Sequence, residues 1–245
     1  MYLKKRIPIY LAGMIIMALG ITFLNKSNLG TTPLSSVPYV LSKILVGKTL
    51  LTFGMLTLMF HSLCILFQVL LWKKFTVKMF LQFPLALAFS ALLDQFMGWI
   101  QIPDPVLWLR ALLCALGITL SALGIVLIVG MDLMLPAPDA FPRSVSARTG
   151  IELHKVKIAG DVTWVTVASI ISIIYLYHNG LTSIGPLLSA CFTGKLAVGI
   201  GTLFSMYFTG RLVGIFRKHL RFLEMEPTEV NWMPLKEKSS IILNK

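Results

Sequence analysis

The chain has 245 residues and a formal net charge of +12, and 56% of its residues are hydrophobic while only 13% are charged. Soluble domains carry about 25% charged residues, so this composition excludes a soluble globular enzyme. It is equally unlike a disordered chain or a small disulfide scaffold. The class that remains is an all-α polytopic membrane protein, a bundle of transmembrane helices whose first partner is the lipid bilayer.

The excess of basic residues has two interpretations. In a soluble domain a net charge of this sign would indicate nucleic-acid binding. Here the basic residues lie in short clusters at the ends of apolar runs, which is the pattern that orients membrane proteins, so we expect no nucleic-acid partner. The cysteines lie far apart within apolar runs and predict neither a disulfide nor a metal site (Cys64, Cys114 and Cys191).

Six apolar runs are long enough to cross a bilayer, which takes about 20 residues of helix. They cover residues 7–24, 49–72, 79–100, 105–131, 156–177 and 181–210. The first run follows basic residues as a signal peptide would. Because the polar stretch Asn25-Lys26-Ser27-Asn28 follows it instead of a small-residue cleavage site, we predict an uncleaved span.

Two shorter pieces, residues 33–46 and 136–148, lie between the long runs. Each begins with prolines and follows a long run. The first would extend only about 21 Å as a helix, which is too short to span comfortably. We therefore predict two re-entrant or interfacial segments.

The order of long and short pieces indicates an internal repeat. Ala18-Leu19-Gly20-Ile21 returns as Ala122-Leu123-Gly124-Ile125, and Pro38 returns as Pro142. A local match in a different frame, Ala115-Leu116-Gly117-Ile118, is equally good, so the order of the pieces is the stronger indication. The predicted units are a first transmembrane repeat over 1–103, a second over 104–218 and a short cytoplasmic tail over 219–245.

The number of spans decides the type of repeat. Six spans make inverted 3+3 repeats, whereas eight spans, with both short pieces crossing, make parallel 4+4 repeats. Both arrangements divide the basic residues equally well between the two sides of the membrane. The tight cluster of Lys73, Lys74 and Lys78 resists export, so it favours six spans with both termini in the cytoplasm.

Candidate binding residues lie at the two junctions that precede the short pieces. In hydrocarbon every backbone polar group needs a partner, so a broken helix is tolerated only inside protein or beside water. Paired broken helices form the substrate site of inverted-repeat transporters. The alternative is an ordinary surface loop that caps the next helix. The predicted substrate-binding residues are Asn28, Gly30, Thr31, Pro33, Ser35, Asp132, Pro138 and Asp139.

Ionisable residues inside a membrane span are functional candidates by default. Asp94, Asp161 and Lys195 lie within long runs, and Lys195 could pair with either acid, so we predict a relay or gate. The alternatives are that Asp94 reaches only the headgroups and that the Lys195 amine snorkels outward from a break between two helices. His61 and Gln68 share one face of an apolar helix, a pattern more typical of interhelical hydrogen bonds than of ligands.

No enzymatic motif is present, neither HExxH nor GxSxG nor GxxxxGK[ST]. We therefore predict no enzyme, no catalytic residue, no metal and no cofactor.

The junction motifs resemble a known family. Asn28-Leu29-Gly30-Thr31-Thr32-Pro33 returns as Asp132-Leu133 with Pro138-Asp139, and Ser146-Ala147-Arg148-Thr149-Gly150 follows. With these motifs, residues 10–215 or so resemble the YczE/YyaS/YitT-type family of bacterial integral membrane proteins. The resemblance implies a plasma-membrane protein with duplicated halves and no established activity. The chain departs from the family at Met134, which is usually glycine, and at Ser35, which is usually an acid.

The leading hypothesis is a secondary transporter or permease for an unidentified small polar solute. Asp132 and Asp139 would bind substrate or a proton, and rocking of the two halves would alternate access to the site. The alternative is a non-transporting membrane assembly or regulatory subunit, in which the polar groups only satisfy helix packing. An intramembrane enzyme is a third and weaker hypothesis. The sequence does not specify the substrate, the coupling ion or the oligomeric state.

Overall fold

The computed structural model describes residues 3–45, 51–102, 106–178 and 198–220, and each element within those ranges is a helix. Its long helices are α1 (Leu3–Lys26), α3 (Phe53–Trp72), α4 (Val77–Trp99), α5 (Leu107–Gly130), α7 (Leu153–His178) and α9 (Ile200–His219). All of these except α9 are long and apolar enough to cross a membrane. The expected polytopic helical bundle is thereby confirmed.

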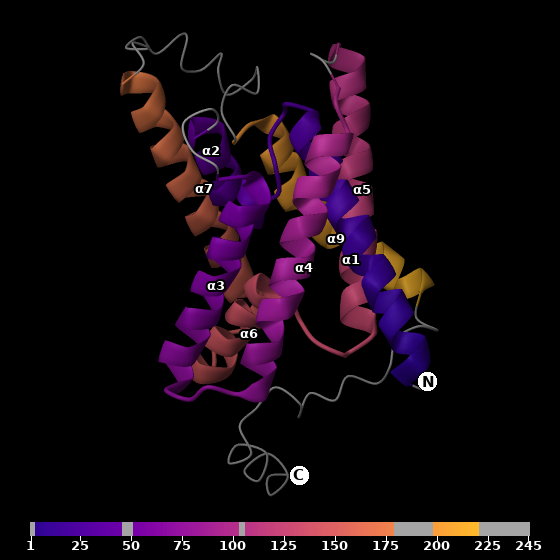
Figure 1. Ribbon diagram of the computed structural model, residues 1–245, viewed down its shortest axis with the longest axis vertical. Coiled ribbons are helices and arrows are strands. Elements are labelled where there is room, and N and C mark those ends of the chain that lie inside the picture. The colour runs from indigo at the N-terminus through magenta and orange to yellow at the C-terminus, as the bar shows by residue number, and fades with distance from the viewer. Residues whose placement is uncertain (1–2, 46–50, 103–105, 179–197, 221–245) are drawn as a thin grey trace, which may run out of the picture.

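Both short pieces form short helices. A 3₁₀ turn, η1 (Pro33–Ser35), leads into α2 (Ser36–Leu45), and α6 spans Ala137–Thr149. Figure 1 shows α2 and α6 at opposite ends of the bundle, with the N-terminus of α1 at the end where α6 lies. Each short helix packs against both α3 and α7. The chain therefore carries a short, proline-initiated helix near each end of the bundle.

The last long helix differs from its predicted range. We expected a span over 181–210, whereas α9 begins at Ile200 and ends at His219. Residues 181–197 and the candidate Lys195 lie outside the described residues. The start of α9 is set by a distant segment, because the Gly201 amide donates to the Leu29 carbonyl at 2.8 Å. Hydropathy carries no signal for such a contact.

Helices α1 and α5 form the closest helix pair. A Cβ atom at Gly20 would lie 2.5 Å from the backbone nitrogen of Ser121, and one at Gly117 would lie 2.7 Å from that of Leu24. Further along, a Cβ at Gly124 would lie 2.7 Å from the nitrogen of Met17. The contacts run in opposite directions along the two helices, so the pair is antiparallel. Small residues allow this approach, as is common between membrane helices.

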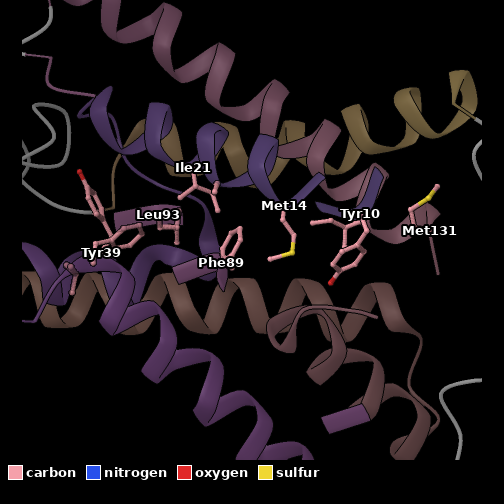
Figure 2. Close-up of a cluster of buried hydrophobic side chains, with 11 residues drawn as sticks. Tyr10, Met14, Ile21, Tyr39, Phe89, Leu93 and Met131 are labelled. Carbon is pink, nitrogen blue, oxygen red and sulfur yellow. The ribbon is translucent and has the colours of Figure 1, made fainter. Parts of the chain in front are cut away.

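A buried cluster joins α1 to α2 and α4. Figure 2 shows its side chains in a row from Tyr39 at one end to Met131 at the other, with the hydroxyl groups of Tyr39 and Tyr10 pointing out of the cluster. The Tyr39 hydroxyl donates to the carbonyl of Asn25 at 2.9 Å, which ties α2 to the end of α1. The Tyr10 hydroxyl is buried and has no hydrogen-bond partner among the described residues. The labelled members between Tyr39 and Tyr10 are Met14, Ile21, Phe89 and Leu93.

Candidate functional site

A cavity of about 440 Å³ lies inside the bundle, lined by residues of η1 and of the helices α1, α3, α4, α5, α6, α7 and α9. Most of its wall is apolar, and includes Met14, Met17, Ile21, Leu85, Phe89, Ile125 and Ile128. The structure brings five of the predicted site residues together here, from segments far apart in the sequence. They are Pro33, Ser35, Pro138, Asp139 and Asp161.

Asp139 is positioned by the start of α6. Pro136 has an extended backbone, and its carbonyl accepts a hydrogen bond from the Asp139 amide at 3.0 Å. A carboxylate in the first turn of a helix interacts favourably with the helix dipole. One carboxylate oxygen, Oδ1, also accepts a hydrogen bond from the ammonium of Lys157 at 3.0 Å. The Asp139 side chain is 12% exposed and the Lys157 side chain 44%, so the acid is the more deeply buried partner.

Asp161 lies one helical turn beyond Lys157 on α7 and lines the same cavity. It also lines a second cavity, of about 250 Å³, between α6 and α7. Asp161 is half-buried and interacts electrostatically with both Lys157 and Asp139. The Lys157 ammonium is therefore close to two carboxylates, with a hydrogen bond to one of them.

Three buried polar atoms on the cavity wall have no hydrogen-bond partner among the described residues: the Tyr10 hydroxyl, His61 Nδ1 and the Ser121 hydroxyl. The His61 ring stacks on Phe89, with 5.9 Å between the ring centroids. Leaving a buried polar group unpaired costs about 1–3 kcal/mol, so these atoms lie where a bound polar group would be favourable. The pattern that His61 shares with Gln68 predicted an interhelical hydrogen bond, whereas its Nδ1 has no partner among the described residues. Tyr10 and Ser121 were not predicted, because a single tyrosine or serine in an apolar helix carries no distinguishing pattern.

Three of the predicted residues of the first junction, Asn28, Gly30 and Thr31, lie outside the cavity wall. Thr31 donates from its amide to the Thr202 hydroxyl at 3.0 Å, and Gly30, with φ of +138°, packs its Cα against Thr202. Asn28 has a left-handed backbone with φ of 54°. None of these three lines the cavity. Their geometry joins the end of α1 to the start of α9.

We expect Thr202→Val to destabilise the protein. The substitution keeps the volume of this fully buried side chain but leaves the Thr31 amide without its acceptor, which costs about 1–3 kcal/mol. Thr202→Ser retains the hydroxyl and serves as the matched control. Thermal unfolding of the purified variants measures the effect. Equal melting temperatures for the valine and serine variants would contradict this role.

Asp132, at the second junction, also lies outside the cavity wall. It has a left-handed backbone, with φ of 45°, like Asn28 at the first junction. The Asp132 carboxylate interacts electrostatically with the Arg143 guanidinium on α6. Burial lowers the pKa of the Arg143 guanidinium below its ordinary value, whereas Asp139 and Asp132 raise it. Asp132 thus contributes to the charge balance around α6 from outside the cavity.

Asp94 ties two long helices together. Its Oδ1 accepts from the Gly54 amide at 2.6 Å, and its Oδ2 accepts from the Thr52 hydroxyl at 2.5 Å. The Thr52 oxygen in turn accepts from the Met55 amide, which caps α3. Asp94 does not line the cavity. Both oxygens are therefore committed to the beginning of α3.

Gln68 makes an interhelical contact, as the pattern predicted. Its side-chain amide donates to Gln82 Oε1 on α4 at 3.2 Å and lies 3.5 Å from the Ala137 carbonyl on α6. This amide links α3 to both neighbours, directly beside the turn that holds Asp139. Within the described ranges, no group of three or more His, Cys, Asp or Glu side chains is placed to hold a metal ion.

The fold and the cavity define a class: a multi-pass bundle of apolar helices with an internal site that contains charged and unpaired polar groups. The chain belongs to a family of unknown function (DUF6198), whose model matches residues 4–197. The matched range includes both junctions and ends before α9. No curated protein and no solved structure matches the chain.

Proposed function

We propose that the protein is a secondary transporter or permease for a small solute in the bacterial plasma membrane, with both termini in the cytoplasm. The observation that carries the proposal is the cavity, in which the ion pair of the mostly buried Asp139 with Lys157 and three unpaired polar atoms face an apolar wall. Sites for small molecules have this composition, mainly apolar with a few placed polar groups.

The matching geometry of the two junctions supports duplicated halves. Asn28 and Asp132 share a left-handed backbone, and each lies two residues beyond the end of a long helix. The Ser35 amide donates to the Thr32 carbonyl, and the Asp139 amide donates to the Pro136 carbonyl, both at 3.0 Å. Ser35 is separated from Asp139, and Thr32 from Pro136, by the same number of residues as Pro38 from the repeated Pro142. The resemblance to the YczE/YyaS/YitT-type family is part of this proposal.

The packing supports inverted halves rather than parallel ones. Helix α2 packs on α3 and α7, and α6 packs on the same two helices from the opposite end of the bundle (Figure 1). The closest pair, α1 with α5, joins the first helices of the two halves and is antiparallel. In inverted-repeat transporters the substrate site lies between such halves. Ser35 and Asp139, at equivalent positions, both line the cavity, so one half would supply a neutral group and the other a charge.

The test is access to the cavity from both sides of the membrane. The Ile125→Cys variant, made in a chain whose three native cysteines are alanine, is exposed to a membrane-impermeant thiol reagent in right-side-out and in inside-out vesicles. Alternating access predicts labelling from both sides, because Ile125 lines the cavity and is only half-buried. The matched control is Ser90→Cys, a buried serine outside the cavity wall, which we expect to be protected from both sides. Labelling of the Ile125→Cys variant from one side only would favour the non-transporting alternative.

A further inference from the structure

We infer that the solute is an amphipathic organic amine, bound as its ammonium ion with the charged nitrogen at Asp139 and the apolar body along the cavity wall. This inference rests on the proposed function and narrows the class of solute. Four observations support it: how deeply the charged side chains are buried, which hydrogen-bond acceptors line the cavity, the apolar wall, and the lysine that pairs with Asp139.

The depth of the charges favours a cation. Asp139, at 12% exposure, is more buried than Lys157. The other exposed basic side chains on the wall, His154 and Arg211, already have partners near the surface. His154, with a side chain 66% exposed, pairs with Glu152, and the exposed Arg211 stacks on Tyr207 at 3.9 Å. Arg143 also acts on Asp139 but does not line the cavity. A charged ligand that enters deeply therefore reaches a carboxylate.

The unpaired atoms can complete the coordination of an ammonium group. A primary ammonium has three N–H donors and no acceptor. The Tyr10 hydroxyl oxygen accepts hydrogen bonds, and so does His61 Nδ1 when the ring proton is on Nε2. Both residues line the cavity and interact electrostatically with Asp139, whereas Ser121 lies beside Gly20, about 15 Å further along α1 than Tyr10. An anion would instead face the charge of Asp139.

The cavity wall is complementary to the apolar part of an amphipathic solute. Methionine, isoleucine and phenylalanine side chains from α1, α4 and α5 dominate the cavity opposite the charged residues of α6 and α7. Its volume of about 440 Å³ is within the range of small-molecule sites, about 300–1,000 Å³. A purely polar solute would leave most of this wall without a complementary surface.

Lys157 shows that the Asp139 carboxylate binds a primary ammonium group. Its side chain is itself a primary ammonium on an alkyl chain, held 3.0 Å from the carboxylate. An amine ligand competes with it for the same oxygen. Lys157 is nearly half exposed, and Asp161 lies one turn along the same helix, so the displaced lysine retains a carboxylate partner. Removing Lys157 should therefore strengthen the binding of an amine, whereas it would destroy a site for anions.

The experiment uses three probes of similar size at neutral pH: 2-phenylethylamine as the cation, 2-phenylethanol as the neutral control and phenylacetate as the anion. Each is titrated against the purified full chain, and saturable thermal stabilisation is measured. We expect the amine to bind about tenfold more tightly than either control compound. Asp139→Asn should weaken amine binding by about tenfold or more, and Lys157→Met should strengthen it severalfold. The matched control variants, Glu152→Gln and Lys155→Met, remove exposed charges outside the cavity wall and should bind the amine as the wild type does.

The outcomes separate this inference from the proposed function. Preferential binding of phenylacetate, lost in Lys157→Met, would overturn the amine inference while retaining a solute site. Labelling of the Ile125→Cys variant from both sides, without amine binding by the wild type, would overturn the inference and leave transport supported. Amine binding with labelling from one side only would support the inferred ligand site and overturn transport.

Discussion

Replacing Gly20 by alanine is expected to lower the free energy of unfolding by about 3 kcal/mol, at the upper end of overpacking effects. In an open helix this change would stabilise by up to about 1 kcal/mol, because alanine has the higher helix propensity. Here the added methyl group would lie 2.5 Å from the Ser121 nitrogen and 2.9 Å from the Gly117 carbonyl oxygen. Both are backbone atoms of α5, so no side-chain rotation relieves the clash, and the two helices must separate.

Thermal unfolding in detergent measures this effect, and the melting temperature should fall by roughly 10 °C for a chain of this size. The matched control is Gly98→Ala on α4, where no atom lies within 4 Å of the added methyl group. That variant should be neutral or slightly stabilised. Equal stability of the two variants would mean that α1 and α5 do not approach as closely as described.

Replacing Asp94 by alanine is expected to cost about 3 kcal/mol or more, because two hydrogen bonds to a carboxylate are lost, each contributing about 1.5–3 kcal/mol. The loss leaves the Gly54 amide unsatisfied at the start of α3 and releases that end of α3 from α4. Asp94→Asn should be intermediate, since its amide oxygen can still accept from Gly54. The measurement is again the thermal unfolding transition.

Glu152→Gln is the matched control for Asp94. The Glu152 carboxylate is 62% exposed and pairs with exposed partners, so its loss should change stability by less than about 1 kcal/mol. The pair of Asp94 variants also tests the predicted relay role. If Asp94 is a relay residue, Asp94→Asn should unfold like the wild type and lose activity. If Asp94 instead links α3 to α4, the same variant should lose stability.

The composition and hydropathy were sufficient to predict a helical membrane bundle, since a bilayer requires long apolar helices with satisfied backbones. They also predicted two short pieces where the structure has η1 with α2, and α6. Prolines mark these starts, because proline fixes its backbone angle and suits the first turn of a helix. These are local properties, so a single sequence contains them.

The composition of the cavity required the tertiary structure. Thr31 and Ser35 lie four residues apart at the same break, but the first binds to α9 and the second faces the cavity. The sequence around the break does not determine which part of the molecule each of these residues contacts. They depend on where the start of α9 meets the end of α1, a contact between segments about 170 residues apart.

The sequence by itself determined the class of protein and, except for α9, the approximate ranges of the long and short helices, and it named Asp139 and Asp161 as candidates. Only the tertiary structure decided which groups meet. Lys157 lies beside Asp139 because α6 folds back onto α7. Tyr10, His61 and Ser121 complete the cavity from three different helices. Hydropathy reports how much of a helix is apolar, whereas the packing of neighbouring helices determines which of its few polar atoms are buried together.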